Sequence, residues 1–537
     1  MQGTCGVLHH GEIHNAAELR RELGLGPSTS LAQVLLAGWR RWADDLWSRL
    51  DGVFALAIRD ADRLLLYRDP SGLCNLYLYH GQRGQVAFGT DLNRLMQLPG
   101  VARRVARAGL HEYLRFGDIA APQTIFEDVV AVQAGWRLCW SARGLESHPA
   151  PPGHDVEPTI ADFAAAVDQL GVLLDGAVQR RLEGALRPAA FLSGGVDSAL
   201  LCALGRQHRA DLTALTVGFD APHFDESPVA RRIAQHLGLR HEVLRFDHGE
   251  CLSAFERLRA GAEQPAADPA TPITLLAFEH CRGRFDAVLD GTGADEALGM
   301  MPPRHVRLAV GYASLLPPAL RRQVTALLRL LPGLAGYARI TDFEHPADMM
   351  IRWSGFTRPE VEALCGEPVS FADSHFYRTF GRFPRQAHFA RYSALLDAMP
   401  GDRLSQAMQV SHLTVRFPFC DAATDRYIRH LCTDFRYLPG QPKRILRALL
   451  ARYVPPSIWD APKHGFDFPL RDFLINHEHA LVKRYLTADR WRRTGGLSPA
   501  VVQQYGERFM AGDASLTFRV WVLVLLGAWL EQHGGPS

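Results

Sequence analysis

The stretch FLSGGVDSALL, residues 191–201, places a serine, a glycine pair, an aspartate and a second serine between two apolar runs. The first run is typical of a buried strand and the second of a helix. Gly194 and Gly195 let backbone N–H groups approach an anion at the positive start of the helix, and Ser193 and Ser198 add donors. A carboxylate among anion ligands requires a cation, so we interpret Asp197 as a Mg²⁺ ligand in a pyrophosphate-binding loop.

The segments that follow this loop predict a parallel α/β sheet. Strand-like runs (LTALTVGF, FDAVLDG) alternate with helix-like ones (SPVARRIAQHLG, ITLLAFEHCRG), which places the loop at the carboxyl edge of the strands, where open sheets bind ligands. Upstream, residues 49–90 predict antiparallel hairpins. The Pro-rich residues 146–158 predict a linker, residues 160–183 a long helix, and the chain beyond about residue 305 an almost wholly helical part.

The composition is that of a globular chain of 537 residues, 47% hydrophobic and 22% charged, long enough for two or three domains. The net charge of +2 gives no bias toward nucleic acid. Nine cysteines without a C-x-x-C pair, and a start without signal-peptide character, predict a cytoplasmic location. The apolar residues 520–530 are too few to span a bilayer and predict a buried helix. We therefore expect neither a nucleic-acid nor a membrane partner.

The loop is not a Walker A sequence, because no Gly-Lys-Ser/Thr follows, and it resembles the loop of ATP-pyrophosphatases, which cleave ATP between the α and β phosphates. Other segments resemble the asparagine synthetase B family in the family's order. Four N-terminal segments resemble its glutaminase domain: GEIHNAAEL, DGVFALAIRD, LYRDPSGLCNLYLY and VAFGTDL. The segment LDGTGADEALGM (289–300) resembles its second nucleotide motif, which usually reads S-G-E-G-A-D-E. VRFPFCD (415–421) and residues 443–469 resemble its V-R-x-P-F-L-D and C-terminal Lys-rich signatures.

The resemblance, which runs from residue 11 to about 470, implies an α/β fold of two domains. Residues 1–150 are expected to form a degenerate class II glutamine amidotransferase-like domain with the α/β/β/α layers of N-terminal nucleophile hydrolases. Residues 151–537 are expected to form an ATP-pyrophosphatase synthetase domain with a parallel sheet and a largely helical C-terminal part.

The resemblance also implies ATP and Mg²⁺ as cofactors and assigns the site residue by residue. Mg²⁺ is assigned to Asp197 and Asp295. Lys463 is assigned to stabilise charge on the acyl-adenylate and the tetrahedral intermediate, which makes Lys463, Asp197 and Asp295 the catalytic set. The ATP and pyrophosphate contacts are assigned to Ser193, Gly194, Gly195, Asp197, Ser198, Gly218, Gly291 and Lys443.

The N-terminal part departs from the family at its glutaminase residues. The family's nucleophile is an N-terminal cysteine with its own amine as base, whereas position 2 is Gln and Cys5 is internal. His10 replaces the oxyanion-hole asparagine of N-G-E-I-x-N, and the Thr-Asp that binds the glutamine amine reads Thr29-Ser30. We expect that glutamine hydrolysis is lost.

The synthetase part departs as well. Thr292 replaces the glutamate implicated in handling ammonia, and Ser405 and Thr414 replace acidic pocket residues. Similar losses occur in β-lactam synthetase, carbapenam synthetase and the lasso-peptide macrolactam cyclases, which join a substrate amine directly. The favoured hypothesis is therefore an AMP-forming amide synthetase whose small-molecule or peptide substrate carries both a carboxylate and an amine, with a precursor peptide and a partner protease in the lasso-peptide case.

Two alternatives remain open. One is an asparagine synthetase that uses free ammonia or receives it from a partner, against which Thr292, Ser405 and Thr414 count. The other is a non-catalytic nucleotide-binding homologue, against which the complete SGGVDS loop, the GAD triplet and Lys463 count. The dependence of ATP–pyrophosphate exchange on added carboxylates distinguishes the three hypotheses.

Overall fold

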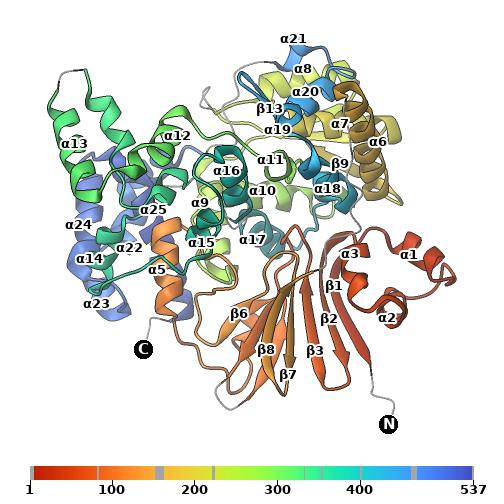
Figure 1. Cartoon of the computed structure of the whole chain (residues 1–537), viewed down its shortest axis with the longest axis horizontal. Coiled ribbons are helices and arrows are strands. Elements are labelled where there is room, and N and C mark those ends of the chain that lie inside the picture. The colour runs from red at the N-terminus through yellow and green to blue at the C-terminus, as the bar shows by residue number, and fades with distance from the viewer. Residues whose placement is uncertain are drawn as a thin grey trace.

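The computed structural model describes residues 5–81, 84–150, 162–220, 224–331, 333–351, 355–398, 402–460 and 468–534. Figure 1 shows three parts: antiparallel sheets from the N-terminal residues, a parallel sheet with its helices, and a helical C-terminal part beside both. The predicted mixed α/β class, with a parallel sheet between an N-terminal sheet part and a helical C-terminal part, is confirmed.

The N-terminal part contains two antiparallel sheets. The five-stranded sheet has the order β1 (Gly6–Ile13), β2 (Gly52–Asp60), β3 (Arg63–Arg68), β7 (Trp136–Ser141) and β8 (Gly144–Pro149). The three-stranded sheet has the order β5 (Val86–Gly89), β4 (Tyr77–His80) and β6 (Val129–Ala131). The accompanying helices are α1 (Ala16–Glu22), α2 (Leu31–Trp42), η1 (Ala43–Asp45), α3 (Leu46–Arg49), α4 (Leu92–Leu95) and α5 (Arg107–Phe116).

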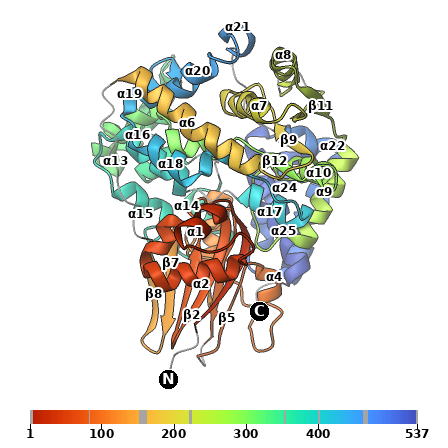
Figure 2. The same ribbon diagram turned by 90° about the vertical axis from the view of Figure 1, so that its right-hand side faces the viewer.

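The side chains of β2 alternate between the two faces of the five-stranded sheet, which explains why helices stack on one face and the three-stranded sheet on the other. Phe54, Leu56 and Ile58 share one core with buried side chains of α1, α2 and α3. Figure 2 shows α1 and α2 lying against this sheet. Ala55 and Ala57 point to the opposite face and join the core that contains the second sheet. Successive side chains of a strand face opposite sides, so the apolar residues 53–58 of this strand hold helices on one face and a sheet on the other.

The parallel sheet has the order β11 (Arg240–Leu244), β10 (Thr213–Val217), β9 (Pro188–Phe191) and β12 (Ala287–Leu289). After β9 the chain builds β10 and β11 on one side and then returns to build β12 on the other side. The strand order therefore reverses between β9 and β12, and ligands bind at such switch points. The surrounding helices are α6 (Phe163–Leu182), α7 (Val196–His208), α8 (Ser227–Leu237), α9 (His248–Gly261), α10 (Thr271–Cys281) and α11 (Ala294–Leu298).

The C-terminal part is helical apart from a two-residue-strand hairpin, β13 (Tyr437–Leu438) and β14 (Gln441–Pro442). Its α-helices are α12 (Arg304–Gly311), α13 (Pro318–Leu330), α14 (Arg358–Cys365), α15 (His375–Gly381), α16 (His388–Ala398), α17 (Asp402–Ser411), α18 (Ala422–His430), α19 (Thr433–Arg436), α20 (Arg444–Leu450), α21 (Pro456–Trp459), α22 (Leu470–Tyr485), α23 (Ala488–Thr494), α24 (Pro499–Met510) and α25 (Thr517–His533). Short 3₁₀ turns are η2 (Ala313–Leu315), η3 (Ala335–Ile340), η4 (Pro346–Met350), η5 (Pro418–Cys420) and η6 (Ala514–Leu516).

The apolar segment near the C-terminus forms α25, and most of its side chains are buried in the large core. Ala514–His533 has the length and apolarity to cross a membrane, but 61% of its most apolar window is buried inside the fold. This agrees with the predicted buried helix. The predicted linker is wrong at its start, because Glu146 to Pro149 belong to β8, an exposed edge strand whose polar side chains resemble a linker in sequence.

A buried ion cluster joins the N-terminal part to the parallel-sheet part. Arg181 of α6 is 1% exposed, and its Nη2 and Nη1 lie 3.3 Å from Asp51 Oδ1 and 3.3 Å from Asp421 Oδ2. Asp421 also pairs with Arg180 and caps α18 by accepting from Thr424 N at 3.1 Å. The buried guanidinium of Arg181 therefore pairs with two buried carboxylates that come from different parts of the chain.

Glu263, which follows α9, makes a second buried connection between the same parts. Its carboxylate accepts from Tyr77 Oη at 2.7 Å, Leu92 N at 2.7 Å and Asn75 Nδ2 at 3.1 Å in the N-terminal part, and from Gln409 Nε2 at 2.9 Å on α17. Burial raises the pKa of Glu263 to about 7, although these donors oppose the shift.

Candidate active site

The predicted pyrophosphate loop connects β9 to α7 and is closed on itself by its two serines. Ser193 N donates to Ser198 Oγ at 3.0 Å, and the two hydroxyl oxygens lie 2.9 Å apart. Gly195, the N-cap of α7, donates its N–H to Ser193 Oγ at 3.0 Å. The hydroxyls thereby fix the loop at the positive end of a 13-residue helix, which is an arrangement suited to anions.

A carboxylate already lies against this loop. Glu226, at the start of α8, accepts the N–H of Gly194 with its Oε2 at 3.2 Å. The contact shows that an N–H of the glycine pair is accessible to an anionic oxygen. Sequence reasoning missed Glu226, because it lies more than 30 residues beyond the loop and precedes an ordinary helix.

Three predicted residues from distant segments meet beside the loop. The ammonium of Lys443 pairs with Asp197 Oδ2 on α7 and lies 2.7 Å from Asp295 Oδ1 on α11. Lys443 is the N-cap of α20 and has a left-handed backbone with φ of 56°, a conformation that disfavours residues with a Cβ. Burial alone would lower the pKa of Lys443, but the two carboxylates outweigh it and raise the pKa above its usual value.

The carboxylates fit the cation that the sequence predicts. Asp197 and Asp295 converge on one positive centre, and Asp197 Oδ1 is buried with no hydrogen-bond partner among the described residues. Mg²⁺ prefers oxygen ligands and usually combines one or two carboxylates with phosphate oxygens. The unpartnered oxygen is therefore available to a divalent cation.

Glycine is required sterically at both predicted nucleoside positions. A Cβ on Gly291, which follows β12, would lie 3.3 Å from Ser198 N and 3.4 Å from the Asp197 Cβ, so glycine lets the two nucleotide loops touch. A Cβ on Gly218, at the end of β10, would lie 2.8 Å from Val243 Cγ1. Glycine at these positions therefore keeps the backbone close packed at the carboxyl edge of the sheet.

The remaining predicted positions are spread around this centre. Ser405 is buried on α17, and Thr414 is exposed just before the segment that adjoins β12. Lys463 lies outside the described residues. A carboxylate that sequence reasoning did not single out occupies the loop itself: Asp290 Oδ1 accepts from Thr292 N at 2.8 Å and from Thr292 Oγ1 at 2.6 Å. A carboxylate therefore lies against the side chain of position 292.

Arg416 connects this loop to the N-terminal part. Its backbone adjoins β12, with Arg416 N donating to Val288 O at 2.8 Å and Asp290 N donating to Arg416 O at 3.0 Å. Its guanidinium donates to Glu12 of β1 through Nε at 2.9 Å and through Nη2 at 3.3 Å. The carboxylate of the GEIHN segment therefore binds an arginine of the synthetase part.

In the N-terminal part, the positions at which this chain departs from the glutaminase pattern lie on β1 and at the start of α2. His10 is exposed on β1 opposite Ala55. Ser30 caps α2, accepting from Gln33 N at 3.4 Å while Ser30 N donates to Gln33 Oε1 at 3.2 Å. His14 is buried, and burial together with the positive Arg181 and Arg416 lowers its pKa to about 3. This histidine is consequently neutral at physiological pH.

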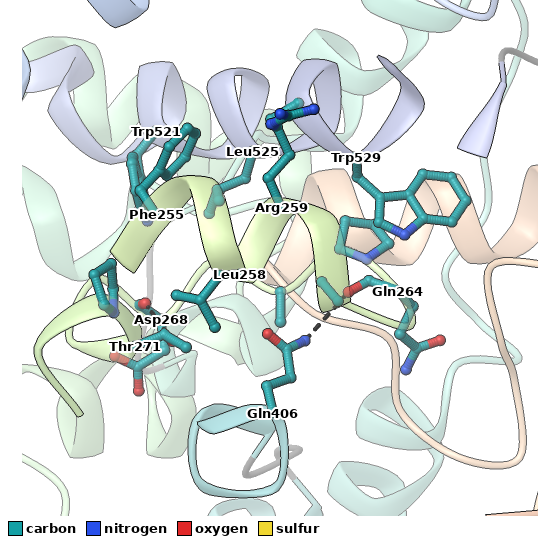
Figure 3. Close-up of a pocket in the computed structure, with 15 residues that line it drawn as sticks. Phe255, Leu258, Arg259, Gln264, Asp268, Thr271, Gln406, Trp521, Leu525 and Trp529 are labelled. Atoms are coloured by element: carbon teal, nitrogen blue, oxygen red, sulfur yellow. Dashed lines mark hydrogen bonds between the residues drawn. The ribbon is translucent and has the colours of Figure 1, made fainter. Parts of the chain in front are cut away.

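A largely apolar pocket lies between α9, α10, α17 and α25 (Figure 3). Phe255, Trp521 and Trp529 form part of its wall, and Gln406 Nε2 donates to Gln264 O at 3.2 Å on one side. None of the predicted nucleotide-binding residues lines it. The pocket is therefore separate from the phosphate loop.

Lysine is rare in this chain, and one of the few lysines lies beside the phosphate loop. Of 59 lysine and arginine residues, three are lysines: Lys443, Lys463 and Lys483. Two of these three occur in the C-terminal signature. Lysine carries a compact point charge, whereas arginine carries a broad planar fork. Lys443 places such a compact ammonium between Asp197 and Asp295.

The switch point of the parallel sheet carries a phosphate-type loop, two carboxylates and a lysine, and this part is joined to two stacked antiparallel sheets. Together these features define the class of ATP-using amide synthetases. The chain belongs to the asparagine synthase family, which it matches over residues 169–531. Residues 1–149 match the glutamine amidotransferase domain. Members of the family use ATP and form carbon–nitrogen bonds, and this chain is accordingly a carbon–nitrogen ligase.

Relatives cover nearly the whole chain. A Mycobacterium bovis protein provisionally named asparagine synthetase [glutamine-hydrolyzing] is 26% identical over 97% of this chain and 84% of its own length. Asparagine synthetase [glutamine-hydrolyzing] 1 of Bacillus subtilis is 23% identical over 98% and 85%. Amidase chyE of Penicillium rubens is 24% identical over 93% and 82%.

Similarity to solved structures is weak. The Bacillus subtilis glutamine phosphoribosylpyrophosphate amidotransferase with ADP and GMP has 15% identity over 45% of this chain and 46% of that chain, with a TM-score of 0.21. The glutamine-dependent NAD⁺ synthetase of Acinetobacter baumannii has 12% identity over 53% and 74%, with a TM-score of 0.20. TM-scores this low carry no argument about the present chain.

Proposed function

We propose that this ligase forms AMP: it adenylates a substrate carboxylate and joins the activated acyl group to a substrate amine. The observation that carries the proposal is the meeting of Asp197, Asp295 and Lys443 beside the SGGVDS loop. Opposite charges are concentrated there at the switch point of the sheet, where pyrophosphate would leave. An acid-activating reaction needs positive charge at this point, because negative charge accumulates on the departing pyrophosphate.

In the first step the substrate carboxylate attacks the α-phosphorus of ATP, and the bond between the α-phosphorus and the bridging oxygen to the β-phosphate breaks. The start of α7 would hold the pyrophosphate oxygens, one of which would replace the Glu226 carboxylate on the N–H of Gly194. The Lys443 ammonium would neutralise part of their charge. Asp197 and Asp295 would hold Mg²⁺, which supplies further neutralisation when bound.

In the second step the amine attacks the acyl carbon, the bond to AMP breaks, and one amine proton must be removed. We assign the proton acceptor to Asp290, because its carboxylate lies at the Thr292 side chain, where the family has glutamate. Lys463 is assigned to the oxyanion. Holding both partners in one site can supply about 7–11 kcal/mol of the barrier.

We assign the amine to the substrate itself. His10 and Ser30 replace glutaminase residues, and Glu12 is bound to Arg416. This favours a peptide or small molecule that carries both groups, as in macrolactam closure of a lasso peptide, in a cytoplasmic setting with a precursor peptide and a partner protease. The names of the relatives favour a second candidate, asparagine formation from free ammonia, against which Thr292, Ser405 and Thr414 count.

ATP–pyrophosphate exchange tests the proposal. The purified chain is assayed with Mg²⁺ and with aspartate, or with peptides that carry a free amine and a side-chain carboxylate, and nucleotide products are separated. Exchange dependent on such peptides, with AMP as product, supports the proposal, and exchange dependent on aspartate supports the second candidate. ADP as product, or glutamate released from glutamine, contradicts the proposal.

A further inference from the structure

Residues 304–340, which form α12, η2, α13 and η3 and are called here the α13 surface, carry apolar side chains on the outside of the molecule. Among the described residues fifteen large apolar side chains are exposed, and eight of them lie in residues 312–337. Leu330 is 80% exposed and Tyr312 70%. The eight are Tyr312, Leu315, Leu320, Leu327, Leu330, Leu331, Leu334 and Tyr337. A contiguous exposed apolar patch marks an interaction site.

Helix α13 is fastened to the protein by polar side chains. Its buried residues are Arg321 and Thr325. Arg321 Nη2 donates to Phe343 O at 2.7 Å, and its guanidinium lies 4.1 Å from the centre of the Phe343 ring. Thr325 Oγ1 donates to Thr341 Oγ1 at 2.7 Å. Polar groups thus hold the inner side of the helix and leave its leucines facing outward.

The leucines share one flank of the helix. Leu320, Leu327 and Leu330 of α13 are separated by seven and three residues, which places them along the same side of the helix. Figure 1 shows α13 at the outer edge of the molecule, far from the N-terminal sheets.

The charged residues of the α13 surface are arginines, and one of them, Arg329, pairs with Asp342 just beyond the surface. Residues 297–341 contain six arginines and no aspartate or glutamate. Five of the arginines are exposed: Arg304, Arg307, Arg322, Arg329 and Arg339. In a symmetric dimer the same patch would face itself, so a second copy would bring like charges together, which is unfavourable. The charge is complementary to an anionic occupant.

We propose that the α13 surface binds an anionic membrane surface, with α13 lying in the plane of the interface. Amphipathic helices with leucines on one side and arginines on the other bind in this way. The leucines enter the boundary with the acyl chains, the arginines contact lipid phosphates, and Tyr312 and Tyr337 occupy the headgroup level. This inference departs from the expectation of no membrane partner, which considered only membrane-spanning segments, and it is independent of the proposed ligase activity.

Vesicle co-sedimentation tests this proposal with the purified full-length chain. The vesicles contain either phosphatidylcholine alone or three parts phosphatidylcholine and one part phosphatidylglycerol. Wild-type protein is expected to sediment with the anionic vesicles and to be released by salt, since the attraction of surface arginines to lipid phosphates is screened within a Debye length. Equal binding to the neutral vesicles, or no binding to the anionic ones, overturns the proposal.

Matched variants locate the contact. The double variant L327E/L330E and the double variant R304E/R322E are each expected to lower partitioning about tenfold or more. Leu186→Glu is the control, because Leu186 is 79% exposed in a different part of the fold. All substituted residues are exposed, so unchanged thermal unfolding midpoints verify folding. Unchanged partitioning of L327E/L330E overturns the proposal, as does a dimer that this variant abolishes while vesicle binding persists.

Discussion

At the scale of single residues, the position of Lys443 is the most demanding in the site, because a non-glycine residue adopts a left-handed backbone there to place its ammonium between two carboxylates. The same ammonium is positioned to neutralise the leaving pyrophosphate. We expect Lys443→Ala to lower ATP–pyrophosphate exchange about 100-fold or more, since removal of one preorganised charge from a site commonly costs this much.

Lys483→Ala is the matched control for this measurement, because Lys483 is an exposed lysine on α22. It is expected to retain wild-type exchange. A Lys443→Ala variant that keeps more than half of the wild-type rate would remove Lys443 from the site.

Asp290 supports a prediction that separates the two chemical steps. Asp290→Asn keeps an oxygen that can accept from Thr292 N and Oγ1, so the loop is retained, but the side chain can no longer accept an amine proton. With a substrate that supports exchange, we expect exchange within about threefold of wild type and amide formation lowered about 100-fold or more. Equal loss of both activities would assign Asp290 a purely structural role.

The sequence predicts the residue-scale chemistry only where it is local. The SGGVDS loop is contiguous, so its strand–loop–helix setting follows from neighbouring residues, and the structure has it between β9 and α7. The contact of Arg416 with Glu12 spans 404 positions and is invisible to any local pattern. The local sequence does not distinguish Asp290 as a site residue, whereas the structure brings its carboxylate to the side chain of Thr292.

At the scale of elements, the ion cluster of α6 depends on one buried guanidinium. Arg181→Met would leave the carboxylates of Asp51 and Asp421 buried near one another without their shared cation, and breaking such a pair costs about 3–5 kcal/mol. We expect this loss in the free energy of unfolding measured by urea denaturation. Arg180→Met is the control, because the Arg180 side chain is 30% exposed, and it is expected to cost about 1 kcal/mol or less.

The cluster also has defined protonation states. Burial raises the pKa of Asp51 to about 6, whereas Arg181 and Arg180 overcome the effect of burial on Asp421 and lower its pKa to about 2. Asp421 therefore carries a negative charge at neutral pH. If Arg181→Met proves as stable as Arg180→Met, the cluster does not hold the two parts together.

The contact between β1 and the segment beside β12 predicts coupling between elements of different parts. Arg416→Glu would face Glu12 with a like charge and displace the backbone that adjoins Val288 and Asp290, so we expect exchange to fall about tenfold or more. The double variant E12R/R416E restores an opposite pair and is expected to recover most of the rate. A double variant no better than Arg416→Glu would show that the ion pair does not position the loop.

At the scale of the whole molecule, Glu263 makes stability depend on pH. Its pKa is raised by burial from 4.5 to about 7, so its contribution is fully present below about pH 4.5 and is lost as the pH rises through about 7. The difference in unfolding free energy between wild type and Glu263→Gln, which cannot titrate, is expected to change by on the order of 3 kcal/mol between pH 5 and pH 8.

Glu112 provides a check on this reasoning, because burial also raises its pKa to about 7 and it titrates in both proteins. Its effect therefore cancels in the difference. A pH-independent difference would mean that Glu263 keeps an ordinary pKa in the folded chain.

The overall architecture is predictable to the extent that it repeats local patterns. The hairpins of residues 49–90 appear as β2 to β5, and the helix of residues 160–183 as α6. The short strand β11 lacks a continuous apolar run and is recognisable only from its pairing with β10. Residues 146–149 read as a linker because β8 has one neighbour and exposed side chains, so pairing rather than composition determines its structure.

The scarcity of lysine has a practical consequence for chemical modification. Acylating reagents such as N-hydroxysuccinimide esters attack neutral primary amines, and the ammonium of Lys443 is kept protonated and enclosed by its two acids. Lys483, by contrast, is exposed on the solvent-facing side of α22. A dye or a solid support is thus expected to couple to the native enzyme at Lys483 in preference to Lys443.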